Sequence, residues 1–200
     1  MLEVFLFVDP LGTDCRESEA AVIRLAEETH THIDLHFVML LNFRVIDNLM
    51  QALQLDTTDL ALRNQLFDAA TQVALDFKAA QFQGNQKARA LLLAEQEMFL
   101  DGDFTYDEAF AAACIRGAGL NSTSFAADRQ RLTPTDCFNE DFTLAQELGV
   151  EDAPDVVIFN PQTNVNAGWR LGRVANYPRL KAVCAKLATL PSNPQRLHVL

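Results

Sequence analysis

An apolar run, an amphipathic helix and a second apolar run follow one another at the start of the chain, and this order limits the possible folds. The first run covers residues 2–8 and, with almost every position apolar, is typical of a strand covered on both faces. Apolar residues recur every three or four positions over residues 14–29, which predicts a helix. The second run covers residues 33–41. Two strands joined by one helix predict a parallel pair with a right-handed crossover.

The middle of the chain is helical, and strands return near its end. Capping residues, helical periodicity and terminal glycines predict several helices between residues 57 and 148. Short strands are expected at 155–159 and 168–174, followed by a last helix over 177–190. The first helix expected in the middle is capped by Thr57, Thr58 or Asp59 and runs to about residue 82. The others cover residues 86–100 and 106–116, a fourth opening at Ser122 or Thr123, and 134–148.

The order of elements is therefore β-α-β, a helical block, then β-β-α, which predicts an α/β protein with one mixed four-stranded sheet and an inserted helical bundle. We expect residues 1–44 and 149–200 to form the sheet domain and residues 45–148 the inserted helical domain.

Charge and composition exclude several classes of function. A net charge of −11 disfavours binding to nucleic acid, which needs clustered Lys and Arg, and equally disfavours an anionic membrane surface. No secretory signal and no apolar stretch of membrane-spanning length is visible. We therefore expect a cytoplasmic protein that keeps its thiols reduced.

The four cysteines, Cys15, Cys114, Cys137 and Cys184, are far apart in the sequence and form no Cys-x-x-Cys pair. With only four histidines and no His-x-x-x-His, we expect no metal site and no cofactor. Cys114 and Cys184 share helical faces with apolar residues, which is typical of core thiols.

Residues 9–15, Asp-Pro-Leu-Gly-Thr-Asp-Cys, join the first strand to the first helix. The junction resembles the place where thioredoxin-like redox proteins carry Cys-x-x-Cys, with Cys15 as the second cysteine and Gly12 in place of the first. Dithiol exchange needs an attacking thiolate and a resolving partner. We therefore expect the ordinary dithiol reaction to be absent.

A second segment, Gly149 to Phe159, resembles the loop in which these proteins place a cis-proline before the third core strand. The match implies that Pro154 is cis and lies opposite the redox junction. Together the segments resemble the DsbA family, whose thioredoxin fold carries a helical insertion. The resemblance implies a vestigial redox or peptide-binding face formed by Asp9, Gly12, Thr13, Asp14, Ala153 and Pro154.

Within that family, Phe-Val-Asp-Pro-Leu followed by Cys15 looks most like the cytosolic DsbA-like adaptors that deliver the regulator Spx to the ClpXP protease. That resemblance implies a protein partner, either a regulator or a protease component. An adaptor needs a binding surface and no dithiol, so Gly12 is compatible with it.

Other interpretations give Cys15 a chemical role. A helix N-terminus lowers a thiol pKa, whereas the neighbouring Asp14 disfavours the thiolate. Cys15 would then be the catalytic thiol of a monothiol oxidoreductase or isomerase, or of a glutathione-dependent transferase, or it would sense oxidation. Its helical face favours a buried structural thiol.

The remaining features of the two segments have ordinary explanations. Gly12 suits a tight turn, and it also leaves a hollow in which an extended peptide could pair with the backbone at Ala153. Trp169 is expected in the core. The carboxylates of the two segments are expected to form a solvated acidic rim: Asp9, Asp14, Glu151, Asp152 and Asp155.

Overall fold

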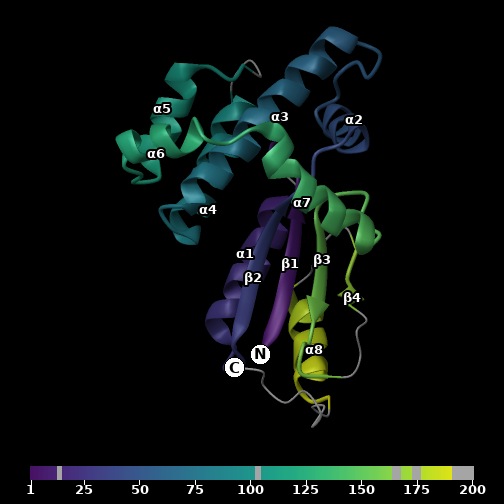
Figure 1. Ribbon diagram of the computed structural model, residues 1–200. Coiled ribbons are helices and arrows are strands. Elements are labelled where there is room, and N and C mark those ends of the chain that lie inside the picture. Colours follow the sequence, from purple (N-terminus) through teal and green to yellow (C-terminus); the bar gives the residue numbers. More distant parts are fainter. Residues whose placement is uncertain (13–14, 102–104, 164–167, 173–176, 191–200) are drawn as a thin grey trace. The chain divides into compact units, whose positions relative to one another are not determined.

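The computed structural model describes residues 1–12, 15–101, 105–163, 168–172 and 177–190 (Figure 1). The chain divides into two compact units. The sheet unit contains Met1–Val8, Asp14–Val38 and Leu148–Leu200, and the helical unit contains Asp9–Thr13 and Met39–Glu147. Domain boundaries at residues 44 and 149 stay a prediction. Most of the net charge of −11 lies on the helical unit.

The sheet unit is built on a four-stranded sheet in the order β2-β1-β3-β4. Strand β3 is antiparallel to β1 and to β4, whereas β1 and β2 lie side by side and run the same way in Figure 1. The predicted α/β class with a mixed four-stranded sheet is confirmed. The strands are β1 Leu2–Val8, β2 Ile33–Met39, β3 Asp155–Phe159 and β4 Trp169–Arg170.

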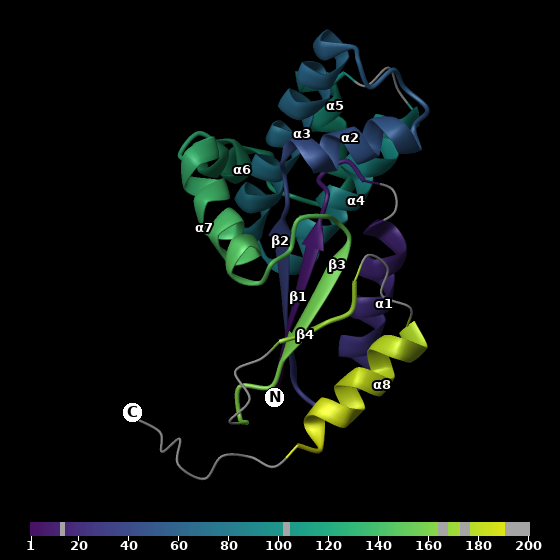
Figure 2. The same cartoon turned by 90° about the vertical axis from the view of Figure 1, so that its right-hand side faces the viewer.

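Helices α1 (Cys15–Glu28) and α8 (Tyr177–Ala188) lie on the same face of this sheet (Figure 2). Val22 and Leu25 of α1 and Leu180 of α8 are fully buried. The outer sides of the two helices also interact, since the Tyr177 hydroxyl donates a hydrogen bond to the Glu28 carboxylate. Burial of each such aliphatic side chain contributes about 1.5–3 kcal/mol.

The helical unit contains six helices among the residues described, one more than expected. Asn42 caps the additional helix by accepting the Val45 N–H at 2.9 Å. Only ten residues long and directly after an apolar strand, this helix offers too few turns for a clear periodicity. The six helices are α2 Phe43–Ala52, α3 Leu60–Gln81, α4 Asn85–Asp101, α5 Glu108–Gly117, α6 Ser122–Arg129 and α7 Pro134–Glu147.

Side-chain caps start three of the other helices. Asp59 accepts the N–H groups of Ala61 and Leu62, at the start of α3. Asp107 caps α5, and Asn121 caps α6. Each cap satisfies N–H groups that have no partner inside the helix, which stabilises the helix by about 1 kcal/mol.

A buried polar cluster joins three helices of the helical unit, α3, α4 and α6, and Tyr106 of the segment before α5. Asp76 on α3 is 1% exposed and accepts hydrogen bonds from the Tyr106 hydroxyl and, at 2.5 Å, from the Arg129 Nε. Arg129, at the end of α6, also donates to Gln72 of α3 at 2.6 Å. The fully buried Glu95 of α4 completes this cluster. Burial, followed by repulsion from Asp76, raises the pKa of Glu95 well above its ordinary value of 4.5.

Glu95→Gln is expected to stabilise the protein at alkaline pH. Because the folded pKa of Glu95 is raised, the folded chain keeps this proton after the unfolded chain has lost it, so stability falls as pH rises above about 4.5. An amide in place of the carboxyl group would remove that loss. Urea unfolding should show a weaker decline between about pH 5 and pH 8 than in wild type. Glu97→Gln, on the exposed side of α4, is the matched control, and an unchanged slope in Glu95→Gln would contradict the prediction.

No helix among the described residues is long and apolar enough to cross a membrane.

Candidate functional site: the strand-to-helix junction and the cis-proline loop

Residues Asp9 to Gly12 form a tight turn that belongs to the helical unit. The Gly12 N–H donates to the Asp9 carbonyl at 3.1 Å, and the Leu11 N–H donates to the Asp9 carboxylate at 2.9 Å. The buried Gln96 side chain of α4 donates to the same Asp9 carbonyl at 3.3 Å. Asp-Pro-x-Gly is the residue pattern preferred by a type I turn, with the aspartate side chain bonding two residues ahead. Asp9 is only 6% exposed, so its expected place in a solvated rim is wrong.

Gly12 is required by this turn because its neighbour occupies the space of a side chain. A Cβ atom at position 12 would lie 2.7 Å from the Asp9 Cβ and 2.8 Å from the Asp9 Oδ2. Both distances are well inside van der Waals contact. A cysteine at this position, as the dithiol pattern would have, therefore requires the turn to rearrange.

Gly12→Ala is expected to lower the free energy of unfolding by about 1–3 kcal/mol, because the added methyl forces Asp9 and the turn apart. In an Asp9→Gly background the same substitution should cost less than about 1 kcal/mol, since the obstructing side chain is gone. Urea unfolding of the four proteins gives both values. Gly117→Ala at the end of α5, where an added Cβ meets nothing within 4 Å, is the control. Equal costs in the two backgrounds would show that Asp9 is not the obstacle.

Cys15 begins α1 and is 1% exposed. It lies on the buried side of the helix with Ser18, Val22 and Leu25, as the periodicity predicted. Glu19 on the same helix is also buried, at 1% exposed, and helical periodicity gave no sign of it. An attacking thiolate must reach its substrate, so a thiol at this depth favours the structural interpretation.

All four cysteines are free and buried. Burial raises the pKa of the Cys184 thiol to about 11. For Cys114, burial and then the carboxylates of Glu95 and Asp76 raise the pKa to about 12. Both thiols are therefore protonated and unreactive at neutral pH.

We expect Ellman's reagent to modify every thiol of the native protein slowly. Because each sulfur is buried, we expect a rate about a hundredfold lower than in urea, where all four react. Cys15→Ala should leave the native rate unchanged. One thiol that reacts quickly in the wild type and disappears in Cys15→Ala would restore the catalytic interpretation.

The loop before β3 contains a cis peptide bond between Ala153 and Pro154, which confirms the expectation for Pro154. The Ala153 N–H donates to the Asp152 Oδ1 at 3.0 Å, so a peptide pairing there must displace Asp152. The expectation that Asp155 belongs to a solvated rim is wrong. It is 2% exposed and accepts a hydrogen bond at 2.5 Å from Arg170, across the β3–β4 pair.

The residues predicted to form one face do not all fall in one unit. Asp9 and Gly12 belong to the helical unit, whereas Ala153 and Pro154 belong to the sheet unit. Thr13 and Asp14 lie outside the described residues. The joint face therefore stays a prediction. Trp169, expected in the core, is half-buried, with the Lys186 ammonium 4.7 Å from its ring centre.

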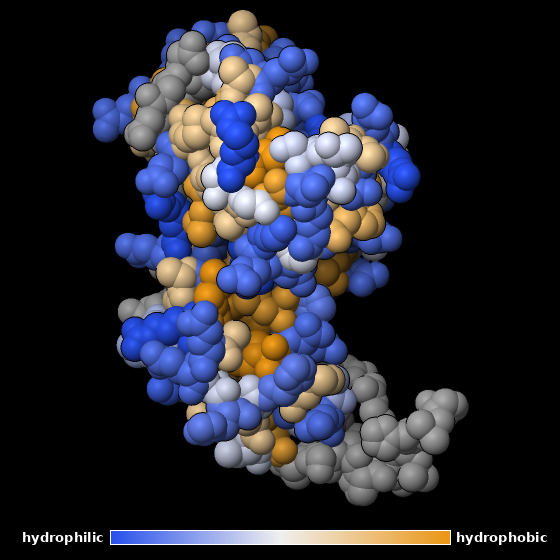
Figure 3. Space-filling model, turned by 90° about the vertical axis from the view of Figure 1, so that its left-hand side faces the viewer, coloured by the Kyte–Doolittle hydropathy of each residue, from blue (hydrophilic) through white to orange (hydrophobic). Residues whose placement is uncertain are grey.

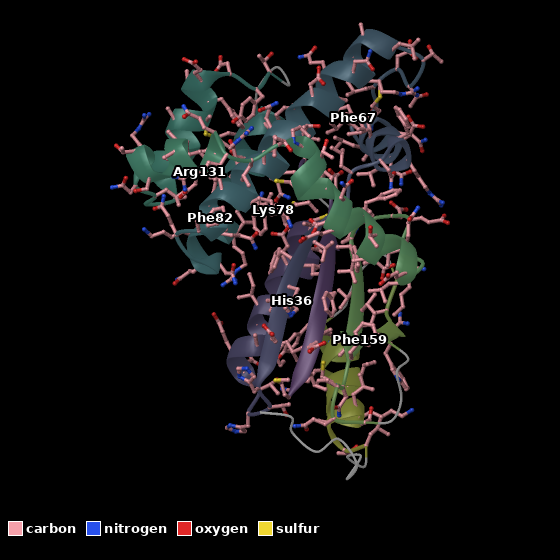
Figure 4. The ribbon with its side chains drawn as sticks, viewed as in Figure 1. His36, Phe67, Lys78, Phe82, Arg131 and Phe159 are labelled. Carbon is pink, nitrogen blue, oxygen red and sulfur yellow. The ribbon has the colours of Figure 1, made fainter. Side chains whose placement is uncertain are left out.

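A groove of about 380 Å³ opens on the helical unit, beside the C-terminal end of α3. Phe82, which directly follows α3 and is 67% exposed, lines this groove, and Figure 4 shows it near Lys78 of α3. Lys78 pairs with Asp141 of α7 at 2.8 Å. Sequence periodicity did not identify this surface, because it combines α3 with residues about fifty positions later or more. Among the described residues, no three potential metal ligands gather.

Comparison with known proteins relates the whole arrangement to one family. Residues 5–182 match the family described as Thioredoxin. The chain is 29% identical over 160 residues to the ClpXP adapter protein SpxH of Staphylococcus haemolyticus, which covers 80% of this chain and 55% of that relative. The chain thus spans about half the length of the curated relatives it matches.

Solved structures agree on the fold. A probable DsbA oxidoreductase from Streptomyces coelicolor superposes with a TM-score of 0.66 at 13% identity, over 100% of this chain and 95% of that one. The cytosolic disulfide reductase DsbM from Pseudomonas aeruginosa superposes with a TM-score of 0.62 at 13% identity, over 94% and 100%. With its mixed sheet, its cis-proline before β3 and its helical insertion, the chain belongs to the thioredoxin family and has the DsbA-like form of that fold.

Proposed function

We propose that the protein is a non-enzymatic adaptor that brings a regulator of the Spx type to the ClpXP protease. The similarity to relatives named ClpXP adapter protein SpxH supports this role. An adaptor accelerates proteolysis by holding substrate and protease together, which raises the effective concentration of one near the other. We also propose a cytoplasmic location, the compartment in which four free thiols stay reduced.

The observation that carries the proposal is the turn at Gly12. The Asp9 side chain fills the space that a first cysteine would need, and the second cysteine position, Cys15, is buried. Neither partner of a dithiol reaction is therefore available, whereas the rest of the thioredoxin scaffold is intact. A thioredoxin scaffold that lacks both thiols of the dithiol reaction favours a binding role over an enzymatic one.

The docking place for the regulator is proposed at the cis-proline loop of the sheet unit, at Ala153 and Pro154. An extended segment of the regulator would pair with the backbone at Ala153 by strand addition. This pairing needs the Ala153 N–H, which donates a hydrogen bond to the Asp152 side chain in the structure. Asp152→Ala would free that N–H and should tighten binding.

The test is degradation of purified Spx by purified ClpXP, followed with and without the protein. We expect degradation to be about tenfold faster or more when the protein is present. Cys15→Ala should accelerate degradation as well as wild type does, because the role uses no thiol. No acceleration by either protein would overturn the adaptor proposal, and acceleration by wild type alone would make Cys15 part of the function.

A further inference from the structure

Among the described residues of the sheet unit, the two helices α1 and α8 lie on the same face of the sheet. Leu2, Val4 and Leu6 of β1 point toward α1 and α8 and are fully buried. Figure 2 shows both helices on that side of the sheet. A strand with a nearly continuous apolar sequence is suited to burial on both faces. Phe5 and Phe7 alternate with these residues and lie on the other face of β1. Phe7 is fully buried, whereas Phe5 is half-buried, so the accessible part of that face is at the Phe5 end of the strand.

The other face carries aromatic side chains across three neighbouring strands. Phe5 of β1 stacks on His36 of β2, with ring centres 4.7 Å apart and planes 15° from parallel. The same ring meets Phe159 of β3 edge-on, at 5.7 Å and 88°. All three side chains are half-buried, and Figure 4 looks onto this face with His36 and Phe159 labelled. These three residues, together with Glu3 and Asp34, form what we call the open face.

Because Gly168 has no side chain, the backbone beside β4 can lie close to the Phe159 ring of the open face. A Cβ atom there would lie 2.6 Å from the Phe159 Cζ and 2.7 Å from the Val157 Cγ1. The Phe159 ring therefore rests against the backbone of residue 168. Seen from the β2 side, Figure 3 shows apolar side chains reaching the surface among hydrophilic ones.

Two carboxylates give the open face a negative end. Glu3 is paired with Phe159 in the β1–β3 register. Asp34 lies two residues before His36 on β2, and its Oδ2 is 3.3 Å from the His36 Nε2. Because alternate residues of a strand share a face, Glu3 and Asp34 flank the aromatic row at the same end of the two strands. The Asp34 side chain is 55% exposed.

We propose that the open face is a docking surface for an amphipathic helix of a protein partner, with Lys or Arg beside its apolar stripe. The aromatic row spans three strands and is therefore about 10 Å wide, which matches the width of one helix with its side chains, about 10–12 Å. The apolar stripe would cover Phe5, His36 and Phe159. The basic residues would meet Glu3 and Asp34.

A defined peptide pair tests this inference. The probe is a fluorescein-labelled helical peptide of about five turns, with leucines at helical spacing, flanking lysines and one benzophenone side chain. Its partner has glutamates in place of the lysines. Fluorescence anisotropy with the full chain should show tighter binding of the lysine peptide, and its photo-crosslinks should fall on residues 3–7, 33–38 or 155–159.

Two double variants distinguish the effect of charge on the open face from the effect of the net charge of the protein on peptide binding. Glu3→Lys with Asp34→Lys should weaken binding of the lysine peptide about tenfold, since two favourable contacts become repulsive. Asp68→Lys with Glu97→Lys, an equal charge change at exposed sites of α3 and α4, should change binding less than about twofold. Equal effects of the two double variants, or crosslinks confined to the helical unit, would overturn the inference.

Self-association is the competing use of the same face. Sedimentation of the wild type should show a monomer, and a dimer that Phe159→Ser dissociates would overturn the inference in favour of a second copy. The inference does not rest on the adaptor proposal. Because the probe replaces Spx and ClpXP, either proposal can fail while the other stands.

Discussion

Arg129→Met is expected to lower the free energy of unfolding by about 3–5 kcal/mol at alkaline pH. Arg129 supplies the positive charge beside Asp76 and Glu95, and its Nε lies 2.5 Å from the Asp76 Oδ1. Methionine keeps much of the side-chain length and removes the charge. Two buried carboxyl groups would then remain with the Tyr106 hydroxyl as the donor to Asp76.

The loss should depend on pH in a defined direction. Without the cation, ionised carboxyl groups of the buried cluster repel one another with no positive charge beside them, so the deficit grows as pH rises and shrinks in acid. Urea unfolding at about pH 5 and about pH 8 measures both quantities. Arg131→Met is the matched control, because the Arg131 side chain is 79% exposed and should contribute less than about 0.5 kcal/mol. Similar costs at the two sites would contradict the account of the buried cluster.

Asp155→Ala is expected to cost about 2–4 kcal/mol, because this buried carboxylate holds the two ends of the cis-proline segment together. Asp155 accepts the Gly172 N–H at 3.2 Å in addition to the Arg170 guanidinium. Arg170 in turn donates to the Gly149 carbonyl at 2.7 Å. Loss of Asp155 would release the contact between the loop at 149 and the strand at 170.

A double-mutant cycle checks that the two side chains act as a pair. Among the described residues, Arg170→Ala leaves the buried Asp155 with the Gly172 N–H as its hydrogen-bond donor, and should cost a similar amount. The double variant should be more stable than the sum of the single losses predicts, by about 1 kcal/mol or more. Additive losses would mean that the 2.5 Å contact contributes little. Adaptor activity of Asp155→Ala then reports whether the shape of this loop matters for the proposed docking.

Local sequence patterns predicted those features that depend on neighbours in the chain. The buried side of α1, with Cys15, Val22 and Leu25, follows from helical spacing alone. The turn formed by residues 9–12 also follows from its residue pattern. Asp at the first position and Gly at the last position are both preferred in a type I turn, which explains the glycine at position 12. The cis bond at Pro154 followed from the resemblance of the loop, and the structure confirms it.

Features that depend on contacts between distant residues could not be predicted in the same way. The sequence predicted that Asp155 is a surface carboxylate. In the structure, antiparallel pairing of β3 with β4 places Arg170 beside it. Asp76 and Arg129 are 53 residues apart, and no periodicity links them. Charged residues are seldom fully buried unless paired, so a sequence alone favours the exposed interpretation even where, as here, it is wrong.

The burial of all four sulfur atoms has a consequence for how the protein meets oxidative stress. A dithiol relative exists in reduced and oxidised forms, and its surface can differ between them. This chain has no cysteine pair at its redox junction, and every thiol is shielded from solvent. We therefore expect the described structure to stay the same under mild oxidants that would convert such a relative, and a partner bound as proposed would then meet the same surface in reducing and oxidising conditions.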